Sequence, residues 1–433
     1  MRNDIVHPGA DELTYAIREI VTVAEELQAM DMHVYWENIG DPVAKGQIVP
    51  SWIKDIVSDL TRTDDNSYGY SPTKGILATR EYLAAMRNNE GGAQITSDDI
   101  LFFNGLGDAI QTSFLYLHPR SRVLGPDPAY PTYSSAEAAH ADAPHLTYKL
   151  DPQKGWQPDL DDIRNKVKYN PQISGILIIN PDNPTGMVYP EEILHGIVAI
   201  AREYDLFVVS DEIYANITYN GTPMVPLSDV LDGVPGIAMK GLSKEVPWPG
   251  ARCGWIEVYN KDSDPIFARY VKTLVDAKML EVCSTTLPQL ALPRIYADTR
   301  YRAHLKEVSA SYGRKANRFA EAFKDVEGVI ANKPSGAFYA SVVFKDGVLR
   351  DDQTLPIADA NVKAYIGQHV HNVPKDKRFV YYLMGATGIT VVPLSGMNST
   401  LAGFRITLLE PDEQVFVAML EKLTGAVQAY LAS

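Results

Sequence analysis

The stretch between residues 100 and 260 alternates short apolar runs with helical patterns, and this alternation limits the possible folds more than any other feature. The apolar runs are "ILFF" (100–103), "SGILIIN" (174–180), "LFVVSDEIY" (206–214), "GIAMKGLSK" (236–244) and "CGWIEVY" (253–259). Between the second and third runs, residues 191–204 place apolar side chains at helical spacing. Strands alternating with helices predict an α/β fold in which helices cover a mostly parallel sheet on both faces.

The C-terminal part of the chain has a different pattern. Short strand-like runs occur in "GAFYASVVF" (336–344), "GITVVPLSG" (388–396) and "GFRITLLE" (403–410). A final helix is expected from about residue 411, with an apolar stripe formed by Phe416, Met419, Leu420, Leu423, Val427 and Tyr430. We therefore predict a large domain of residues 46–300 and a smaller α+β domain made of residues 1–45 and 301–433.

Residues 347–380 fit neither of these patterns, so an irregular insertion is expected there. His369 and His371 lie in this segment and are candidate metal ligands. No third ligand stands at a suitable spacing from them, so no metal site is predicted.

The composition excludes several classes of protein. Among 433 residues, 40 basic and 54 acidic side chains give a formal charge of −14, which argues against nucleic acid or an anionic membrane as the main partner. The two cysteines, Cys253 and Cys283, are too few for a disulfide framework. No signal-peptide core is visible at the N-terminus, and no apolar run approaches the ~18 residues of a membrane span. We expect a cytoplasmic globular protein.

The segment "MKGLSKEVPWPGARCGW" (239–255) contains the first candidate functional residues. Lys244 and Arg252 stand there among small and apolar neighbours, whereas most basic residues lie in polar surroundings. A lysine in such a setting is expected to be partly buried, and a buried lysine needs a reason. The usual reasons are an ion pair or a covalent bond to the carbonyl group of a cofactor or substrate.

Further polar residues follow the predicted strands, where open α/β sheets bind their ligands. Asn183 follows the run at 174–180, and Asp211 and Tyr214 end the run at 206–214. Each has an ordinary alternative, since Asn183 can be a turn residue, Asp211 a helix cap and Tyr214 a core residue. Their joint occurrence on successive strand ends is what those alternatives leave unexplained.

Together with Lys244, these residues predict a site for pyridoxal 5'-phosphate. The lysine amine can react with the cofactor aldehyde, and Asp211 can keep the pyridine nitrogen protonated. Asn183 and Tyr214 can hydrogen-bond the phenolic oxygen of the cofactor.

The phosphate and the ring of the cofactor need further groups. Gly105 and Leu106 open a helix after a strand, and such a helix start together with Arg252 can bind a phosphate. Tyr130, in "DPAYPTY", can stack on the ring. Taken alone, each feature is weak, because "GLG" is not a dinucleotide fingerprint and a tyrosine more often only packs.

The motifs "NPDNPTG", "SDEIY", "GLSK" with Arg252, and "FRITLLE" resemble those of class I/II aminotransferases of the fold type I pyridoxal-phosphate enzymes. The resemblance extends from "ENIGDP" to the final helix and is nearest to alanine-type members. It implies an enzyme that exchanges an amino group between an amino acid and a 2-oxo acid, both of them small-molecule partners. It also implies a homodimer with its sites at the subunit interface.

The resemblance also assigns roles to single residues. Lys244 is implied to be the Schiff-base lysine and the catalytic acid/base, and Ser243 is implied to join the phosphate site. Tyr70, in "YSPTKG", matches a tyrosine that reaches the phosphate in the neighbouring subunit. The α-carboxylate of the substrate is implied to be bound by Arg405, Asn183 and the backbone N–H of Gly40.

Three departures from the family pattern concern the phosphate and the substrate. Gly241 replaces a serine that many members place three residues before the lysine. Leu106 and the segment "KMLE" (278–281) stand where aspartate-specific subgroups have a lysine and an arginine, respectively. We therefore expect a ping-pong aminotransferase whose amino donor is an L-amino acid with a neutral side chain.

Three alternatives remain open at this point. The same cofactor residues fit a β- or γ-eliminating lyase on this fold, and an aspartate-type aminotransferase would need a cation not yet located. A pyridoxal-phosphate-binding regulator would carry a DNA-binding module, for which the sequence offers no basic N-terminal segment.

Overall fold

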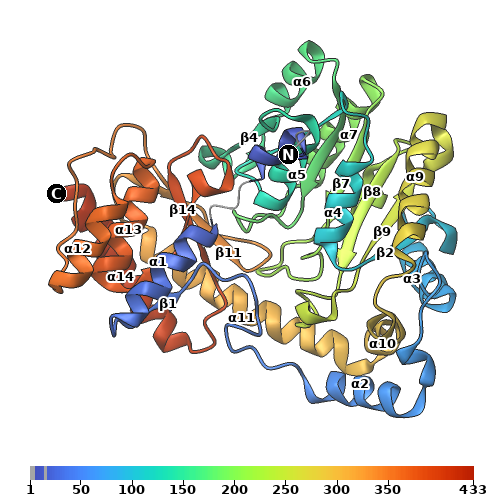
Figure 1. Cartoon of the computed structure of the whole chain (residues 1–433), viewed down its shortest axis with the longest axis horizontal. Helices are drawn as coiled ribbons and strands as arrows, with labels where there is room; N and C mark the ends of the chain where they lie inside the picture. The colour runs from blue at the N-terminus through green and yellow to red at the C-terminus, as the bar shows by residue number, and fades with distance from the viewer. Residues whose placement is uncertain (1–4, 14–16) are drawn as a thin grey trace.

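The computed structural model describes residues 5–13 and 17–433. Its largest part, the large lobe, surrounds an eight-stranded sheet with the strand order β2-β9-β8-β7-β6-β3-β4-β5 (Figure 1). The strands are β2 (Ile100–Phe103), β3 (Arg122–Asp127), β4 (Thr147–Asp151), β5 (Gln157–Pro158), β6 (Ile173–Ile179), β7 (Phe207–Asp211), β8 (Gly236–Gly241) and β9 (Gly254–Tyr259). Only β9 and β5 run against the other strands, so the predicted mostly parallel sheet is confirmed.

Helices cover both faces of this sheet. The helices of the large lobe are α2 (Ser51–Thr63), α3 (Leu77–Glu90), α4 (Leu106–Leu115), α5 (Pro131–Ala141), α6 (Leu160–Tyr169), α7 (Glu191–Glu203), α8 (Leu227–Val230), α9 (Pro265–Glu281) and α10 (Thr286–Ala297), of which α2 lies below the sheet against α10. Neighbouring strand residues belong to different apolar clusters, because Ile178 shares a cluster with Leu194 and Ile197 of α7, whereas Ile179 belongs to the cluster that contains Ile110 of α4. Two buried faces explain why the strands are apolar throughout rather than alternating.

The small lobe contains an antiparallel sheet with the order β10-β11-β14-β13. Its strands are β10 (Val329–Ala331), β11 (Tyr339–Phe344), β13 (Val392–Pro393) and β14 (Gly403–Thr407), and β1 (Tyr35–Trp36) pairs separately with β12 (Ile389–Thr390). Its helices are α1 (Ile17–Ala29), α12 (Ala360–His369), α13 (Lys375–Thr387) and α14 (Glu413–Ala432). The predicted smaller α+β unit is therefore confirmed.

Helix α11 (Thr299–Phe323) links the two lobes and crosses the lower half of the molecule in Figure 1, above α2. Tyr301, near its start, packs in the core of the large lobe, whereas Phe319, near its end, packs in the core of the small lobe. The domain limits 46–300, 1–45 and 301–433 stay a prediction, and residues 1–4 and 14–16 of that range lie outside the described residues.

The C-terminal helix α14 begins two residues later than expected, and every residue of its predicted apolar stripe is buried. By length and composition alone, this helix also passes the test for a membrane span. Its stripe packs inside the small lobe against residues such as Phe379 and Phe404, as in the core helix of a globular protein.

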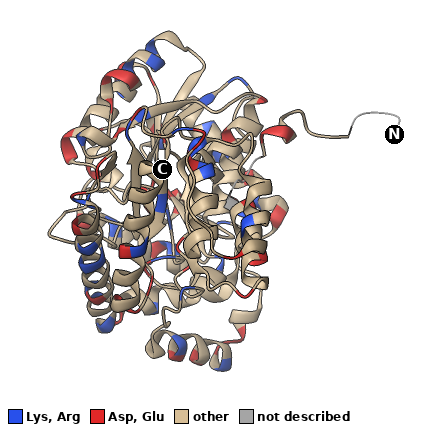
Figure 2. Cartoon of the chain, turned by 90° about the vertical axis from the view of Figure 1, so that its left-hand side faces the viewer, with Lys and Arg blue, Asp and Glu red and all other residues tan. Residues whose placement is uncertain are grey.

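Acidic and basic residues are mixed over the ribbon in Figure 2.

The expectation of an irregular insertion at 347–380 is wrong. The segment contains α12 and the first turns of α13, and Val362 and Ile366 of α12 are buried in the core of the small lobe. Two apolar residues at i, i+4 were too weak a signal to predict this helix among polar neighbours. The ring of His369 lies 4.7 Å from that of Tyr365, and the described residues contain no group of three side chains placed to hold a metal ion.

Candidate active site

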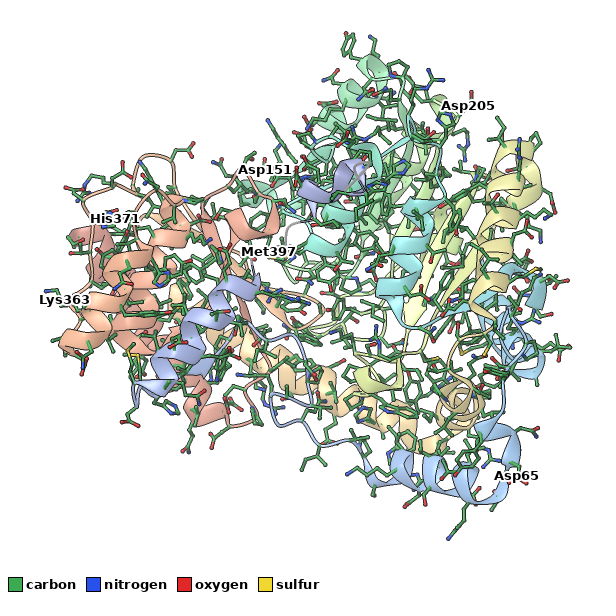
Figure 3. The ribbon with its side chains drawn as sticks, in the orientation of Figure 1. Asp65, Asp151, Asp205, Lys363, His371 and Met397 are labelled. Atoms are coloured by element: carbon green, nitrogen blue, oxygen red, sulfur yellow. The ribbon has the colours of Figure 1, made fainter. Side chains whose placement is uncertain are left out.

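A pocket of about 400 Å³ lies where the two lobes meet, at the carboxyl ends of β6, β7 and β8. Both lobes line it, with Asn183, Asp211 and Lys244 from the large lobe and Arg405 from β14 of the small lobe. Figure 3 labels Met397 near this junction, and the carbonyl oxygen of Met397 accepts a hydrogen bond from the N–H of Ala129, next to Tyr130.

The structure brings most of the sequence-predicted site residues together here. The pocket lining includes Gly40, Leu106, Tyr130, Asn183, Asp211, Tyr214, Ser243, Lys244, Arg252 and Arg405. Gly105 lies at its edge, directly against the guanidinium group of Arg252. Tyr70 is the exception, because it does not line this pocket and its side chain is 87% exposed.

Lys244 projects into the pocket from the segment after β8. Its Nζ donates a 2.7 Å hydrogen bond to the carbonyl oxygen of Gly40 and lies 5.6 Å from the centre of the Phe338 ring. Burial lowers the pKa of this amine to about 8, an effect that the nearby carboxylate of Asp41 opposes and the guanidinium of Arg405 reinforces. Part of the lysine is therefore uncharged near neutral pH, as a nucleophile or a proton acceptor requires.

Asp211 is the last residue of β7 and is 4% exposed. Its Oδ2 accepts a 2.9 Å hydrogen bond from the hydroxyl of Tyr133, and its Oδ1 accepts one of 3.0 Å from the N–H of Ile213. Burial raises the pKa of this carboxyl to about 6, although both hydrogen bonds act in the opposite direction. The carboxylate has no ion-pair partner at salt-bridge distance in the described chain, so a cationic group entering the pocket would stabilise it.

An anion-binding arrangement lies at the edge of the pocket beside Asp211 and Lys244. Gly105 has a φ of +82°, and a Cβ placed on it would lie 2.5 Å from Nη2 of Arg252, so only glycine allows this approach. Arg252 donates to the carbonyl oxygens of Asn104 (3.2 Å) and Pro249 (3.3 Å). Leu106 begins α4, and a helix start beside a guanidinium group favours an anion.

The small lobe contributes Arg405, which is 3% exposed. Its Nη1 donates to Oδ1 of Asn183 at 3.2 Å, and its Nη2 donates to the carbonyl oxygen of Asn38 at 2.6 Å. The guanidinium carbon lies 4.5 Å from the centre of the Tyr339 ring, and Nε has no hydrogen-bond partner in the described chain. A Cβ on Gly40 would lie 2.3 Å from the Tyr339 hydroxyl, so this loop needs a glycine there.

Sequence reasoning missed Tyr339, which lines the pocket, and Tyr133, which lies behind it and donates a hydrogen bond to Asp211. Tyr133 stands three residues after Tyr130, a helical spacing that offered a usable signal in retrospect. Tyr339 offered none, because its place depends on the register of β11 against β14, in which Ser341 pairs with Arg405. The Tyr339 hydroxyl lies 3.1 Å from that of Tyr214 and so connects the two lobes.

Comparison with known proteins identifies the class of this fold and pocket. The sequence profile of aminotransferase class I and II matches residues 38–419, and the chain therefore belongs to this family. The protein is an aminotransferase of the pyridoxal-phosphate fold type I architecture, as the sequence motifs had indicated.

Individual relatives agree with this assignment. An uncharacterized aminotransferase of Methanocaldococcus jannaschii is 51% identical over 431 residues, which cover 100% of both chains. The glutamate–pyruvate aminotransferase of Escherichia coli K12 is 30% identical over 80% of this chain and 84% of its own. The solved structure of alanine aminotransferase from Pyrococcus furiosus matches with a TM-score of 0.82 and 27% identity, covering 98% of each chain.

Proposed function

We propose that this aminotransferase uses pyridoxal 5'-phosphate to move an amino group from an L-amino acid with a neutral side chain to a 2-oxo acid. One observation carries this proposal. An amine with a lowered pKa, a buried carboxylate without a partner at salt-bridge distance among the described residues, and a helix start beside a guanidinium group all face one pocket. The family is known for this cofactor, which supports the same reading.

The residues present fit the cofactor at each of its polar groups. Asp211 would pair with the pyridine nitrogen, which supplies the missing cation, and Lys244 would bind the aldehyde. Asn183 and Tyr214 would hold the phenolic oxygen, and Tyr130 would lie on the ring. The phosphate would be held by Arg252 together with Gly105, Leu106 and Ser243 at the same end of the pocket.

When bound, pyridoxal phosphate supplies an electron-withdrawing ring that stabilises negative charge at the Cα atom of the amino acid. The chain itself then has to position the substrate and move protons. Arg405 orients the α-carboxylate with its planar fork, next to Asn183 and the Gly40 loop. Lys244 accepts the Cα proton, for which its lowered pKa is suited, and later returns a proton.

A single pocket has to serve both substrates in turn. The first 2-oxo acid leaves before the second one enters, so the proposed kinetics are ping-pong. The pocket lies between the two lobes, which limits the access of water to the proton transfers.

The proposed preference for a neutral side chain rests on the charges that line the pocket. Among the described residues, Lys244, Arg252 and Arg405 are the only Lys or Arg side chains that line it, and each already has a proposed role. The remaining lining includes Val21, Ile39, Leu106, Ile110 and Ile213. A second carboxylate would be buried there without a partner, which costs several kcal/mol, whereas an apolar group gains about 25 cal/mol per Å².

Lys278, in the departing "KMLE" segment, is a candidate for a cation that would bind a second carboxylate. Its side chain is bound to Asp108 and Glu281 and does not line the pocket. The solved alanine aminotransferase supports a substrate with a neutral side chain, whereas the name of the glutamate–pyruvate relative pairs such a substrate with the dicarboxylate glutamate. They favour transamination over the eliminating lyase and the regulator.

We also propose a cytoplasmic homodimer. Tyr70 has no place in the pocket of its own chain, and its exposed side chain is free to reach a partner's phosphate site, as the family pattern implies. Light scattering of the purified protein would test the dimer, and a monomer with full activity would refute it.

A panel of amino acids, each with 2-oxoglutarate and with pyruvate, tests the function. We expect alanine, methionine or phenylalanine to give a higher kcat/KM than aspartate, with the matching 2-oxo acid as product. Release of ammonia and pyruvate from a cysteine-like substrate would indicate elimination instead. A clear preference for aspartate over all three would overturn the substrate proposal and support the aspartate-type alternative. The same assay with Lys244→Ala is the control for contaminating activity.

A further inference from the structure

Lys278 lies in the last turn of α9, and its side chain is 1% exposed. Its Nζ lies 3.0 Å from Oδ2 of Asp108 in α4 and is also bound to Glu281. The amine stands 5.0 Å from the centre of the Phe103 ring, at the end of β2. A buried lysine with two carboxylates joins α9 to the point where β2 passes into α4.

Both carboxylates also accept a hydrogen bond from the same residue, Asn104. The N–H of Asn104 donates to Oδ2 of Asp108 at 2.9 Å, and its side-chain amide donates to Glu281. Its Oδ1 accepts from the N–H of Thr285 at 3.0 Å, and its carbonyl oxygen accepts from Arg252 at 3.2 Å. Every polar group of Asn104 is thus engaged, and the last of these contacts reaches the guanidinium at the anion-binding end of the pocket.

We propose that Lys278 is a positioning residue for the phosphate site: it holds Asp108 and Glu281, which fix Asn104 and thereby the Gly105 turn and Arg252. The inference rests on the proposed function, because it concerns how the cofactor phosphate is bound. The "KMLE" segment stands where an aspartate-specific subgroup of the family has a substrate-binding arginine. In this chain its lysine and glutamate hold the phosphate loop in place instead.

The net charge of Lys278, Asp108 and Glu281 shows whether this cluster could attract a phosphate directly or could act only by fixing the position of other residues. One lysine and two carboxylates sum to a net charge of −1, so the cluster as a whole repels a phosphate rather than attracting it. Its benefit for phosphate binding therefore comes from fixing the geometry of Arg252 and the first turn of α4, which carry the attraction.

The test compares pyridoxal phosphate with pyridoxal, which lacks the phosphate. In Lys278→Met, the Kd for pyridoxal phosphate should rise about tenfold or more, because one partner of a buried charge cluster is lost. The Kd for pyridoxal should change much less. The Kd for pyridoxal divided by the Kd for pyridoxal phosphate should therefore fall. Lys272→Met is the matched control, because Lys272 pairs with Asp276 on the exposed side of the same helix.

A second variant, Glu281→Ala, decides between geometry and charge and remains available if Lys278→Met does not fold. Glu281 is 35% exposed, and its loss removes a negative charge together with the contact to Asn104. Positioning predicts weaker binding of pyridoxal phosphate in this variant, whereas simple electrostatics predicts tighter binding.

The outcomes separate this inference from the proposed function. An unchanged ratio in Lys278→Met, or tighter binding of pyridoxal phosphate in Glu281→Ala, would overturn the positioning role. Wild-type protein that binds no pyridoxal phosphate at all would instead refute the proposed function.

Discussion

The two walls of the pocket are built in different ways. The wall proposed to bind the cofactor, here called the cofactor wall, is made of Asn183, Asp211, Tyr214, Lys244 and Arg252. It comes from one stretch of the large lobe at the ends of neighbouring strands. The wall proposed to bind the substrate, here called the substrate wall, is made of Asn38, Gly40, Tyr339 and Arg405, which come from distant parts of the chain.

The contacts of one residue from each wall also differ, because those of Asp211 stay within one lobe and those of Arg405 include one that crosses between the lobes. Asp211 is held by the backbone of Ile213 and by Tyr133 of its own lobe. Arg405 instead reaches across to Asn183 of the large lobe and to the loop at Asn38. The cofactor wall is thus fixed by the sheet, whereas the substrate wall depends on how the lobes meet. We expect changes in the first wall to affect the chemistry and changes in the second to affect substrate binding.

The largest effect is expected for Lys244→Ala, in the cofactor wall. Turnover should fall by about ten-thousand-fold or more, because both the anchor and the proton carrier are lost. The purified wild type should be yellow, and borohydride should fix the cofactor to the peptide that contains residue 244. Mass spectrometry of that peptide provides the check, and cofactor recovered on another lysine would contradict the assignment.

Asp211→Ala should come next, with kcat reduced by about a hundredfold or more. Without this carboxylate, the pKa of the pyridine nitrogen falls and the ring withdraws electrons less strongly. Proton abstraction should slow far more than cofactor binding weakens, as single-turnover kinetics with an amino acid deuterated at Cα would show. Asp211→Glu should keep more activity than Asp211→Ala. Equal activity of wild type and Asp211→Ala would make this carboxylate purely structural.

Arg405→Lys tests the substrate wall. The charge remains, but the planar fork is lost, so kcat/KM for the preferred amino acid should fall by about tenfold to a hundredfold. Most of the change should appear in KM, and the absorbance of the bound cofactor should stay as in the wild type. A loss confined to kcat would break the distinction between the two walls.

The sequence predicted that Asn183, Asp211 and Lys244 would come together, and the structure places them in one pocket, because polar residues at strand ends can be recognised locally. Asn183 and Asp211 each follow an apolar run, and Lys244 stands out among apolar neighbours. Where parallel strands align, their ends meet without further information.

The substrate wall was only partly accessible from the sequence. Arg405 and Gly40 were proposed from the family pattern alone, and Tyr339 was missed. Its place depends on strand register and on the packing of the lobes, which hydrophobic periodicity does not encode. The helix α12 was missed for a related reason, since its apolar face is short and is completed by residues from other helices.

The pH dependence of cofactor capture tests the cofactor wall without any substitution. Burial lowers the pKa of Lys244 from 10.5 to about 8, so its uncharged form reaches one half near pH 8 in the cofactor-free protein. Because only the uncharged amine attacks an aldehyde, capture of pyridoxal phosphate should speed up about tenfold from pH 6 to pH 7 and level off above pH 8. Stopped-flow absorbance gives the rates. A midpoint near 10.5 would show that the amine is exposed to water in solution.

Tyr339→Phe should have the smallest effect and addresses the contact between the walls. The variant keeps the ring that lies 4.5 Å from Arg405 but removes the hydroxyl that lies 3.1 Å from that of Tyr214. Loss of one hydrogen bond of about 1 kcal/mol should lower kcat/KM by about fivefold. Tyr365→Phe in α12 is the control, since its ring packs on His369 away from the pocket.

The form of that loss tells which wall Tyr339 serves. If its hydroxyl acts through Tyr214, the absorbance of the bound cofactor should shift and kcat should fall, because Tyr214 faces the phenolic oxygen in the proposed site. If it acts through the fit of the Gly40 loop, which approaches it closely, only KM should rise. We expect both changes together, because the structure places this hydroxyl against both walls at once. A variant indistinguishable from the wild type in spectrum, kcat and KM would mean that the two walls act independently.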